Sequence, residues 1–220
     1  MSNTAPEGRS ALVLGATGLI GSFLLDRLLQ SPRYSRVAVW ARRSLPISHP
    51  KAVVETLNFE HLQDQRVSAE DVFCCLGTTL KQAGSQEAFR RVDFDYPVAL
   101  ARAAARDGAK RLLVVSALGA DAGSKIFYNR IKGEMEGAVR SAGVGKTYLF
   151  RPSLLSGPRA EPRLGERAGL VIGAVLGPLL GKYRPIHGEL VAAAMLNAAE
   201  RDLPAQDFES PQIRALAQSS

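Results

Sequence analysis

Ser10-Ala11-Leu12-Val13-Leu14-Gly15-Ala16-Thr17-Gly18-Leu19-Ile20-Gly21 is the stretch that decides the fold of this chain. A short apolar run enters a glycine-rich turn, and an amphipathic segment follows as far as Gln30. This order is typical of the first βα unit of a dinucleotide-binding fold. The turn of such a unit brings backbone N–H groups and a helix amino terminus against a pyrophosphate.

Each glycine of this turn has its own predicted task. Gly15 allows the tight turn, Gly18 the close approach of a phosphate, and Gly21 the near contact of helix with strand. We therefore predict that the whole turn binds the cofactor, through Gly15, Ala16, Thr17, Gly18, Leu19, Ile20 and Gly21.

The composition is that of a globular protein. The chain has 220 residues, 46% of them hydrophobic and 22% charged, which suits one α/β domain over residues 1–220. We expect residues 1–9 to be flexible and residues 152–220 to cover the substrate side of that domain. The polar start lacks the basic and apolar parts of a signal peptide, so we expect a cytoplasmic protein.

Cysteines and histidines give no sign of a disulfide or metal site. Cys74 and Cys75 are neighbours in a predicted strand, so their side chains point to opposite faces. His49, His61 and His187 show no ligand spacing. We read the cysteines as small core residues, although a thiol nucleophile is chemically conceivable.

The charge and the most apolar stretch also limit the partners. The net charge is +7, but the basic residues are scattered singly, so we expect no nucleic-acid binding. Gly169–Gly181 is too short for a transmembrane segment and contains Pro178. A buried helix, a homodimer contact, the wall of an apolar substrate pocket and an interfacial membrane contact all stay open.

Apolar runs alternate with helical patterns along the chain. The predicted strands are Ala11–Leu14, Val37–Trp40, Val72–Leu76, Leu112–Ser116 and Thr147–Phe150, and the predicted helices are Leu19–Gln30, Gln86–Asp107, Lys125–Ser141 and Glu189–Arg201. Continuous apolar strands separated by helices indicate a parallel sheet covered on both faces. The prediction is a doubly wound α/β fold of the Rossmann type with a small C-terminal substrate-covering region.

Two arginines bear on the choice of cofactor. Arg42 and Arg43 follow the second predicted strand, about twenty residues beyond the glycine turn, where an acidic residue binds the 2′-hydroxyl of NAD. No acid stands there, and arginine suits the 2′-phosphate of NADP. We therefore predict that NADP(H) is preferred over NAD(H).

Tyr128 and Lys132 form the predicted catalytic pair. Their spacing of four places both on one face of a helix. A neighbouring ammonium stabilises a phenolate and so makes proton transfer by the phenol easier near neutral pH. Ser116 ends a predicted strand and could hold a carbonyl oxygen.

Further ordered motifs run through most of the chain: Gly15–Gly21, Phe73–Thr79, Arg91–Asp93, Ser116–Ala120, Tyr128–Glu134 and Phe150–Pro152. At these residues the chain resembles the short-chain dehydrogenase/reductase superfamily, and within it the atypical NAD(P)-binding branch that includes the Tat-interacting oxidoreductase. The resemblance implies that Tyr128 is the acid/base, that Lys132 binds the nicotinamide ribose and tunes Tyr128, and that Ser116 orients the substrate.

The same resemblance implies further cofactor contacts. Leu76, Gly77 and Thr78 would line the cofactor beside the ribose, and Asn58 with Phe59 would approach the adenine. Asn58 stands where relatives often carry aspartate. Arg151 would join the cofactor site at the start of a segment that leads into the substrate region.

The predicted reaction is hydride transfer between NADPH and a small apolar carbonyl, enone or alcohol, with Tyr128 moving the proton. The alternative is a cofactor-sensing regulatory protein with little or no turnover. A sugar-nucleotide epimerase is a third reading, but the short C-terminal part offers little room for a nucleotide-sugar subdomain.

Overall fold

The computed structural model describes residues 8–157 and 181–219. Most of the apolar stretch Gly169–Gly181 therefore lies outside the described residues, and so do residues 1–7 of the start that we expected to be flexible. The last two residues of that start are described, and Arg9 already belongs to the first strand.

A seven-stranded parallel sheet is the centre of the described structure. Its spatial order is β3-β2-β1-β4-β5-β6-β9, and every neighbouring pair is parallel. The strands are β1 Arg9–Leu14, β2 Tyr34–Ala41, β3 Ala52–Thr56, β4 Asp71–Cys74, β5 Arg111–Val115, β6 Lys146–Arg151 and β9 Asp207–Glu209. A small second sheet pairs β7 Leu155–Ser156 with β8 Ile186–His187.

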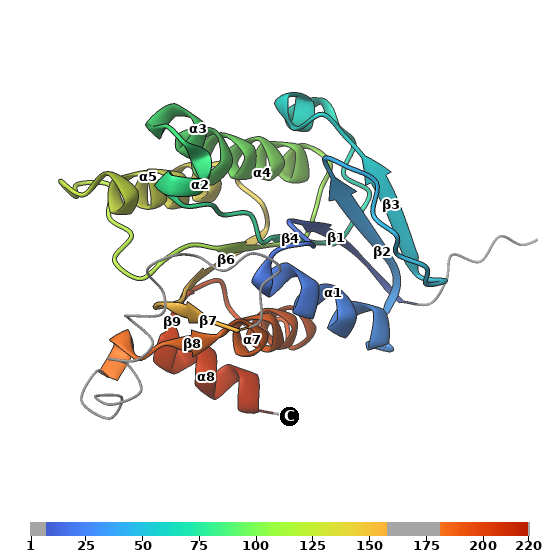
Figure 1. The fold of residues 1–220 in the computed structure, drawn as a ribbon. Helices are drawn as coiled ribbons and strands as arrows, with labels where there is room; N and C mark the ends of the chain where they lie inside the picture. The colour runs from blue at the N-terminus through green and yellow to red at the C-terminus, as the bar shows by residue number, and fades with distance from the viewer. Residues whose placement is uncertain (1–7, 158–180, 220) are drawn as a thin grey trace, which may run out of the picture.

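Helices cover both faces of the sheet (Figure 1). One face carries α1 Leu19–Gln30, α7 Gly188–Glu200 and α8 Ser210–Gln218; the other carries the 3₁₀ segment η1 Phe59–Asp64 together with α4 Tyr96–Arg106 and α5 Phe127–Ser141. Shorter segments are α2 Leu80–Ala83, α3 Gln86–Arg90, the π-helical η2 Arg91–Asp95 and η3 Gly181–Tyr183.

The sheet is apolar on both sides because its side chains alternate between two cores. In β1, Ala11 and Val13 pack with α1 and α7, whereas Leu12 and Leu14 pack toward α4. The predicted doubly wound fold is thus confirmed. Its topological switch lies between β1 and β4, where ligands bind beyond the carboxyl ends of the strands.

Buried charges join the opposite, amino-terminal ends of the strands. The Tyr34 hydroxyl donates to Asp71 Oδ2 at 2.7 Å, and Arg111 Nη1 donates to Asp71 Oδ1 at 2.7 Å. Arg111 also pairs with Asp202, which lies between α7 and β9. This network ties β2, β4 and β5 to the C-terminal part of the chain.

Several predicted boundaries need correction. The sequence prediction missed β3 and β9, and it treated Gln86–Asp107 as one helix although η2 interrupts it. Leu76 and Ser116 lie just beyond their strands rather than inside them. Ile126 has extended backbone, so α5 begins at Phe127 and not at Lys125.

Candidate functional site

The glycine turn is packed tightly against the ends of β1 and β4. Gly15 has a φ of +90°, and a Cβ atom there would lie 2.7 Å from the carbonyl carbon of Cys75. A Cβ atom on Gly21 would lie 2.1 Å from the carbonyl oxygen of Gly15. A side chain at either position would force the backbone apart, so the turn requires glycine at both places.

The amino terminus of α1 suits an anion. Gly18 is its N-cap and brings no side-chain oxygen to the first N–H groups, and the first turn carries no acidic residue. Thr17 and Gly18 are exposed at this end of the helix. Backbone N–H groups and the positive end of the helix dipole therefore face outward at the switch point, as a pyrophosphate would require.

Tyr128 and Lys132 lie on α5, as predicted. Tyr128 is half-buried, with its ring 5.5 Å from the ring of Phe89. Lys132 is only 3% exposed, and its Nζ lies 2.7 Å from Oδ1 of the fully buried Asp93. Burial by itself lowers the pKa of Lys132, but the Asp93 carboxylate and the Tyr128 phenol outweigh it, and this pKa stands above its ordinary value.

The loop after β4 is joined to the same group. Thr78 donates its backbone N–H to Asp93 Oδ2 at 2.9 Å, and a Cβ atom on Gly77 would lie 3.6 Å from Asp93 Oδ1. Leu76, which precedes them, is half-buried. The structure thus brings the predicted cofactor-lining loop and the predicted catalytic lysine together through Asp93.

Ser116 and Arg151 meet at a different place on α5. The Ser116 hydroxyl donates to Glu136 Oε1 at 2.5 Å, and Arg151 Nε donates to the same oxygen at 2.9 Å. Arg151 also reaches Asp207 of β9. Glu136 is eight residues beyond Tyr128, about 12 Å along the helix axis. The predicted roles of Ser116 and Arg151 stay predictions.

The residues predicted around the adenosine are spread over three positions. Arg42 and Arg43 are exposed immediately after β2. Asn58 caps η1, because its Oδ1 accepts the Glu60 N–H at 3.1 Å. The Phe59 ring is buried in an edge-to-face contact with Tyr96, so this side chain belongs to the core.

Sequence reasoning gave no role to Asp93 or Glu136. A lysine predicted on a buried helix face signals that a carboxylate must lie near it. It does not say which one, because Asp93 precedes Lys132 by 39 residues and lies on another helix. Only the folded arrangement identifies the partner.

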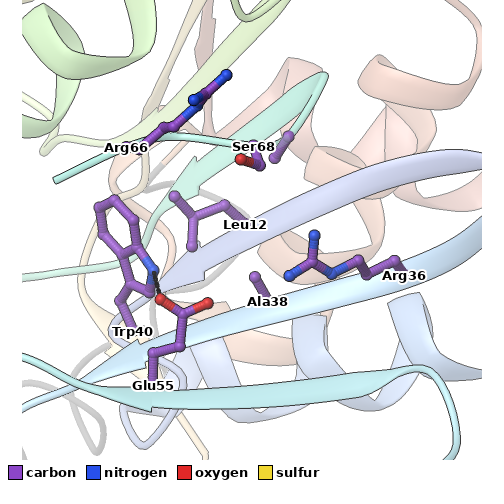
Figure 2. Close-up of a pocket in the computed structure, with 8 residues that line it drawn as sticks. Leu12, Arg36, Ala38, Trp40, Glu55, Arg66 and Ser68 are labelled. Carbon is purple, nitrogen blue, oxygen red and sulfur yellow. Dashed lines mark hydrogen bonds between the residues drawn. The ribbon is translucent and has the colours of Figure 1, made fainter. Parts of the chain in front are cut away.

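A separate hollow lies over the face of β1, β2 and β3 (Figure 2). There Trp40 Nε1 donates to Glu55 Oε2 at 3.2 Å. The lining residues are Leu12, Arg36, Ala38, Trp40, Glu55, Arg66, Ser68 and Ala69. Leu12 and Ala38 lie within their strands, so the hollow is not part of the site at the glycine turn.

A family model described as "NAD dependent epimerase/dehydratase family" matches residues 11–126. Among curated proteins, the chain is 36% identical over 169 residues to Protein FMP52, mitochondrial, of Coccidioides immitis, covering 70% of this chain and 69% of that protein. It is 36% identical over 166 residues to Protein HTATIP2 of Rattus norvegicus, covering 73% of this chain and 68% of that protein.

Solved structures share the fold at lower identity. MoeE5 in complex with UDP-glucuronic acid and NAD aligns with a TM-score of 0.70 and 20% identity, over 90% of this chain and 75% of that one. The UDP-glucose 4-epimerase of Thermotoga maritima with UDP-glucose aligns with a TM-score of 0.67 and 18% identity, over 95% and 81%. These likenesses show the Rossmann-type architecture.

The expected cytoplasmic location needs correction. The FMP52 relatives from Coccidioides immitis, Candida albicans and Eremothecium gossypii are all named mitochondrial. These names contradict an expectation that was based on the polar start of the chain alone. Within residues 8–157 and 181–219, no helix is both long enough and apolar enough to cross a membrane.

Proposed function

We propose a function from one premise: this chain belongs to the NAD dependent epimerase/dehydratase family, as an atypical short-chain dehydrogenase/reductase related to HTATIP2 and FMP52. Members of this family are NAD(P)-dependent enzymes of the oxidoreductase or epimerase type. Our proposal for this chain is NADP(H)-dependent hydride transfer to or from a small apolar carbonyl, enone or alcohol. We further propose that it works in mitochondria, as the names of its fungal relatives suggest.

One observation carries the proposal: Tyr128 and Lys132 share a face of α5, and Lys132 is held beside the loop that follows β4. That loop lies at the switch point, next to the turn in which Gly15 and Gly21 leave no space for a Cβ atom. The turn and the open end of α1 fit the pyrophosphate of a dinucleotide, through residues 15–21.

The bound dinucleotide would supply or accept the hydride. Tyr128 would donate its phenolic proton to the substrate oxygen during reduction and take it back during oxidation. The charge on Lys132 would lower the cost of forming the phenolate, and its remaining N–H groups would hold the nicotinamide ribose. Arg42 and Arg43 are exposed where a 2′-phosphate would lie, which favours NADP(H).

Exposed apolar side chains beside these residues support an apolar substrate. Leu80 is 40% exposed and follows the Thr78 loop, and Ile126 is 61% exposed two residues before Tyr128. Large apolar side chains at such positions are typical of the walls of a binding site. The wall of an apolar pocket was one of the readings left open for the stretch Gly169–Gly181, of which only the last residue is described.

The test follows NADPH absorbance with purified full-length protein and a panel of apolar aldehydes, ketones, quinones and enones. We expect Tyr128→Phe to lower kcat by about 10²- to 10⁴-fold, the usual contribution of a general acid. The NADPH Kd, measured by fluorescence, should change less than about threefold. Lys132→Met should lose turnover as well, whereas the exposed Lys125→Met, as its matched control, should not.

Turnover that survives Tyr128→Phe unchanged would remove Tyr128 as the acid/base. NADPH binding without consumption of any substrate in the panel would instead support the cofactor-sensing alternative, in which binding of a partner depends on NADPH and survives the Tyr128→Phe change.

A further inference from the structure

A buried ion pair lies behind the proposed catalytic face. Lys132 and Asp93 are 3% and 0% exposed, and their charged atoms are 2.7 Å apart. They come from different helices, because Lys132 lies on α5 and Asp93 on the π-helical η2. Such π turns are frequent at functional sites.

Asp93 has two separate partners. Its Oδ1 faces Lys132, and its Oδ2 accepts the backbone N–H of Thr78 at 2.9 Å. One carboxylate therefore fixes the lysine and the loop after β4 relative to each other. Any ligand held by both Lys132 and this loop would meet a geometry that Asp93 sets.

The charge on Lys132 depends on this partner. Burial without a counter-charge lowers the pKa of a lysine, by several units in documented cases. The groups that act on Lys132 are Asp93 from η2, Tyr128 from its own helix and Cys74 from β4. Of these three, Asp93 alone is a carboxylate, and burial raises the pKa of Cys74 to about 11, so the thiol is neutral near pH 7.

We propose that Asp93 is a positioning residue, whose carboxylate keeps the Lys132 ammonium charged and directs it between Tyr128 and the loop Leu76–Thr78. This inference rests on the proposed function, because it concerns the lysine that tunes Tyr128. It adds a member from η2 to the Tyr128–Lys132 pair. Asp93 itself touches neither substrate nor cofactor in this scheme.

The first experiment needs no turnover. Lysine is labelled with ¹³C at Cε in the full-length protein, the Lys132 signal is assigned with Lys132→Arg, and its pH titration is followed by NMR. We expect Lys132 of the unchanged protein to stay charged to pH 10 or above. In Asp93→Asn it should titrate at least one unit lower, and in Asp95→Asn, an exposed acid on the same π turn, it should titrate as in the unchanged protein.

The same titration in Asp93→Asn as in the unchanged protein would overturn the proposal. Should Asp93→Asn not fold, the titration of Lys132 in the unchanged protein still tests the proposal. A Lys132 that titrates below the ordinary value of about 10.5 there would overturn the proposal by itself.

The second experiment separates positioning from a merely structural role. We expect the kcat deficit of Asp93→Asn to grow as the pH rises through the range in which the NMR titration shows its lysine losing charge. When Lys132→Met is already present, adding Asp93→Asn should lower kcat by less than about a further twofold. A deficit that does not depend on pH and adds fully to that of Lys132→Met would contradict the proposal. Absence of turnover in the unchanged protein would count against the proposed function and leave the NMR result valid.

Discussion

Gly21 of α1 lies so close to Gly15 that a Cβ atom on Gly21 would stand 2.1 Å from the Gly15 carbonyl oxygen. We expect Gly21→Ala to push α1 away from the turn. NADPH affinity should fall at least tenfold, and unfolding should become easier by about 1–3 kcal/mol, as for an overpacked core position. Fluorescence binding and urea unfolding measure the two effects.

Gly137 provides the matched control. It also lies within a helix, but no heavy atom outside the neighbouring backbone of that helix lies within 4 Å of the Cβ position. Alanine there should stabilise the protein by up to about 1 kcal/mol and leave NADPH binding unchanged. Equal effects of the two substitutions would show that the close approach of Gly21 to Gly15 has no consequence.

Arg42 and Arg43 are predicted to select the cofactor. Replacing both with alanine should weaken the binding of NADPH by about tenfold or more and that of NADH by less than twofold, because the 2′-phosphate is present only in NADPH. Titration of both cofactors by fluorescence measures the ratio. Replacing Arg36, an exposed arginine on β2, the strand that precedes them, with alanine should change neither affinity. An equal loss of NADPH and NADH in the double variant would refute the arginine argument.

The Asp71 network should govern stability rather than the site. Arg111→Met leaves the fully buried Asp71 without its main counter-charge, and we expect a loss of about 3–5 kcal/mol in the free energy of unfolding. Tyr34→Phe removes one hydrogen bond that a neutral hydroxyl donates to the same carboxylate, and it should cost about 1–3 kcal/mol. Urea unfolding ranks the two variants, and NADPH affinity should be the same in both. The reverse ranking would show that Arg111 is not the main counter-charge.

Stability should decline in alkali because of a buried thiol. Burial raises the pKa of Cys74 from 9.0 to about 11 in the folded protein. The contribution of the protonated Cys74 thiol to the free energy of unfolding is fully present below pH 9. It is lost as the pH rises toward 11, because the thiol of the unfolded chain loses its proton at lower pH than the thiol of the folded protein. A pKa shift of this size corresponds to a loss of roughly 2–3 kcal/mol in the free energy of unfolding.

Urea unfolding at pH 8, 9, 10 and 11 measures this decline. Burial also raises the pKa of Tyr34, so some pH dependence should persist without the thiol. Cys74→Ala should be less stable at pH 8, because it leaves a small cavity, but its stability should fall less steeply with pH. Identical slopes would show that Cys74 contributes no alkaline destabilisation.

The sequence predicted the first βα unit well because its signals are local. The helix predicted over Leu19–Gln30 has the same bounds as α1, since a glycine turn precedes it and apolar residues follow a helical period. The central strands were found because they are continuously apolar. β3 was missed because it lies at the sheet edge with half-exposed side chains, and β9 because it has only three residues.

The interior of the site could not be predicted in the same way. Spacing placed Tyr128 and Lys132 on one helix, but the contacts of Lys132 with Asp93 and of Ser116 with Glu136 join residues 39 and 20 positions apart. Such pairs depend on how helices pack on the sheet. The sequence shows the residues that need partners, and only the fold chooses the partners.

The π turn at Arg91–Asp95 also has a consequence for insertions and deletions. An α-helix has 3.6 residues per turn, so each residue removed rotates the following helix by about 100° against the preceding one. Chain length at this point therefore sets how α3 and α4 are rotated relative to each other, and with that rotation which side chain of the segment faces Lys132.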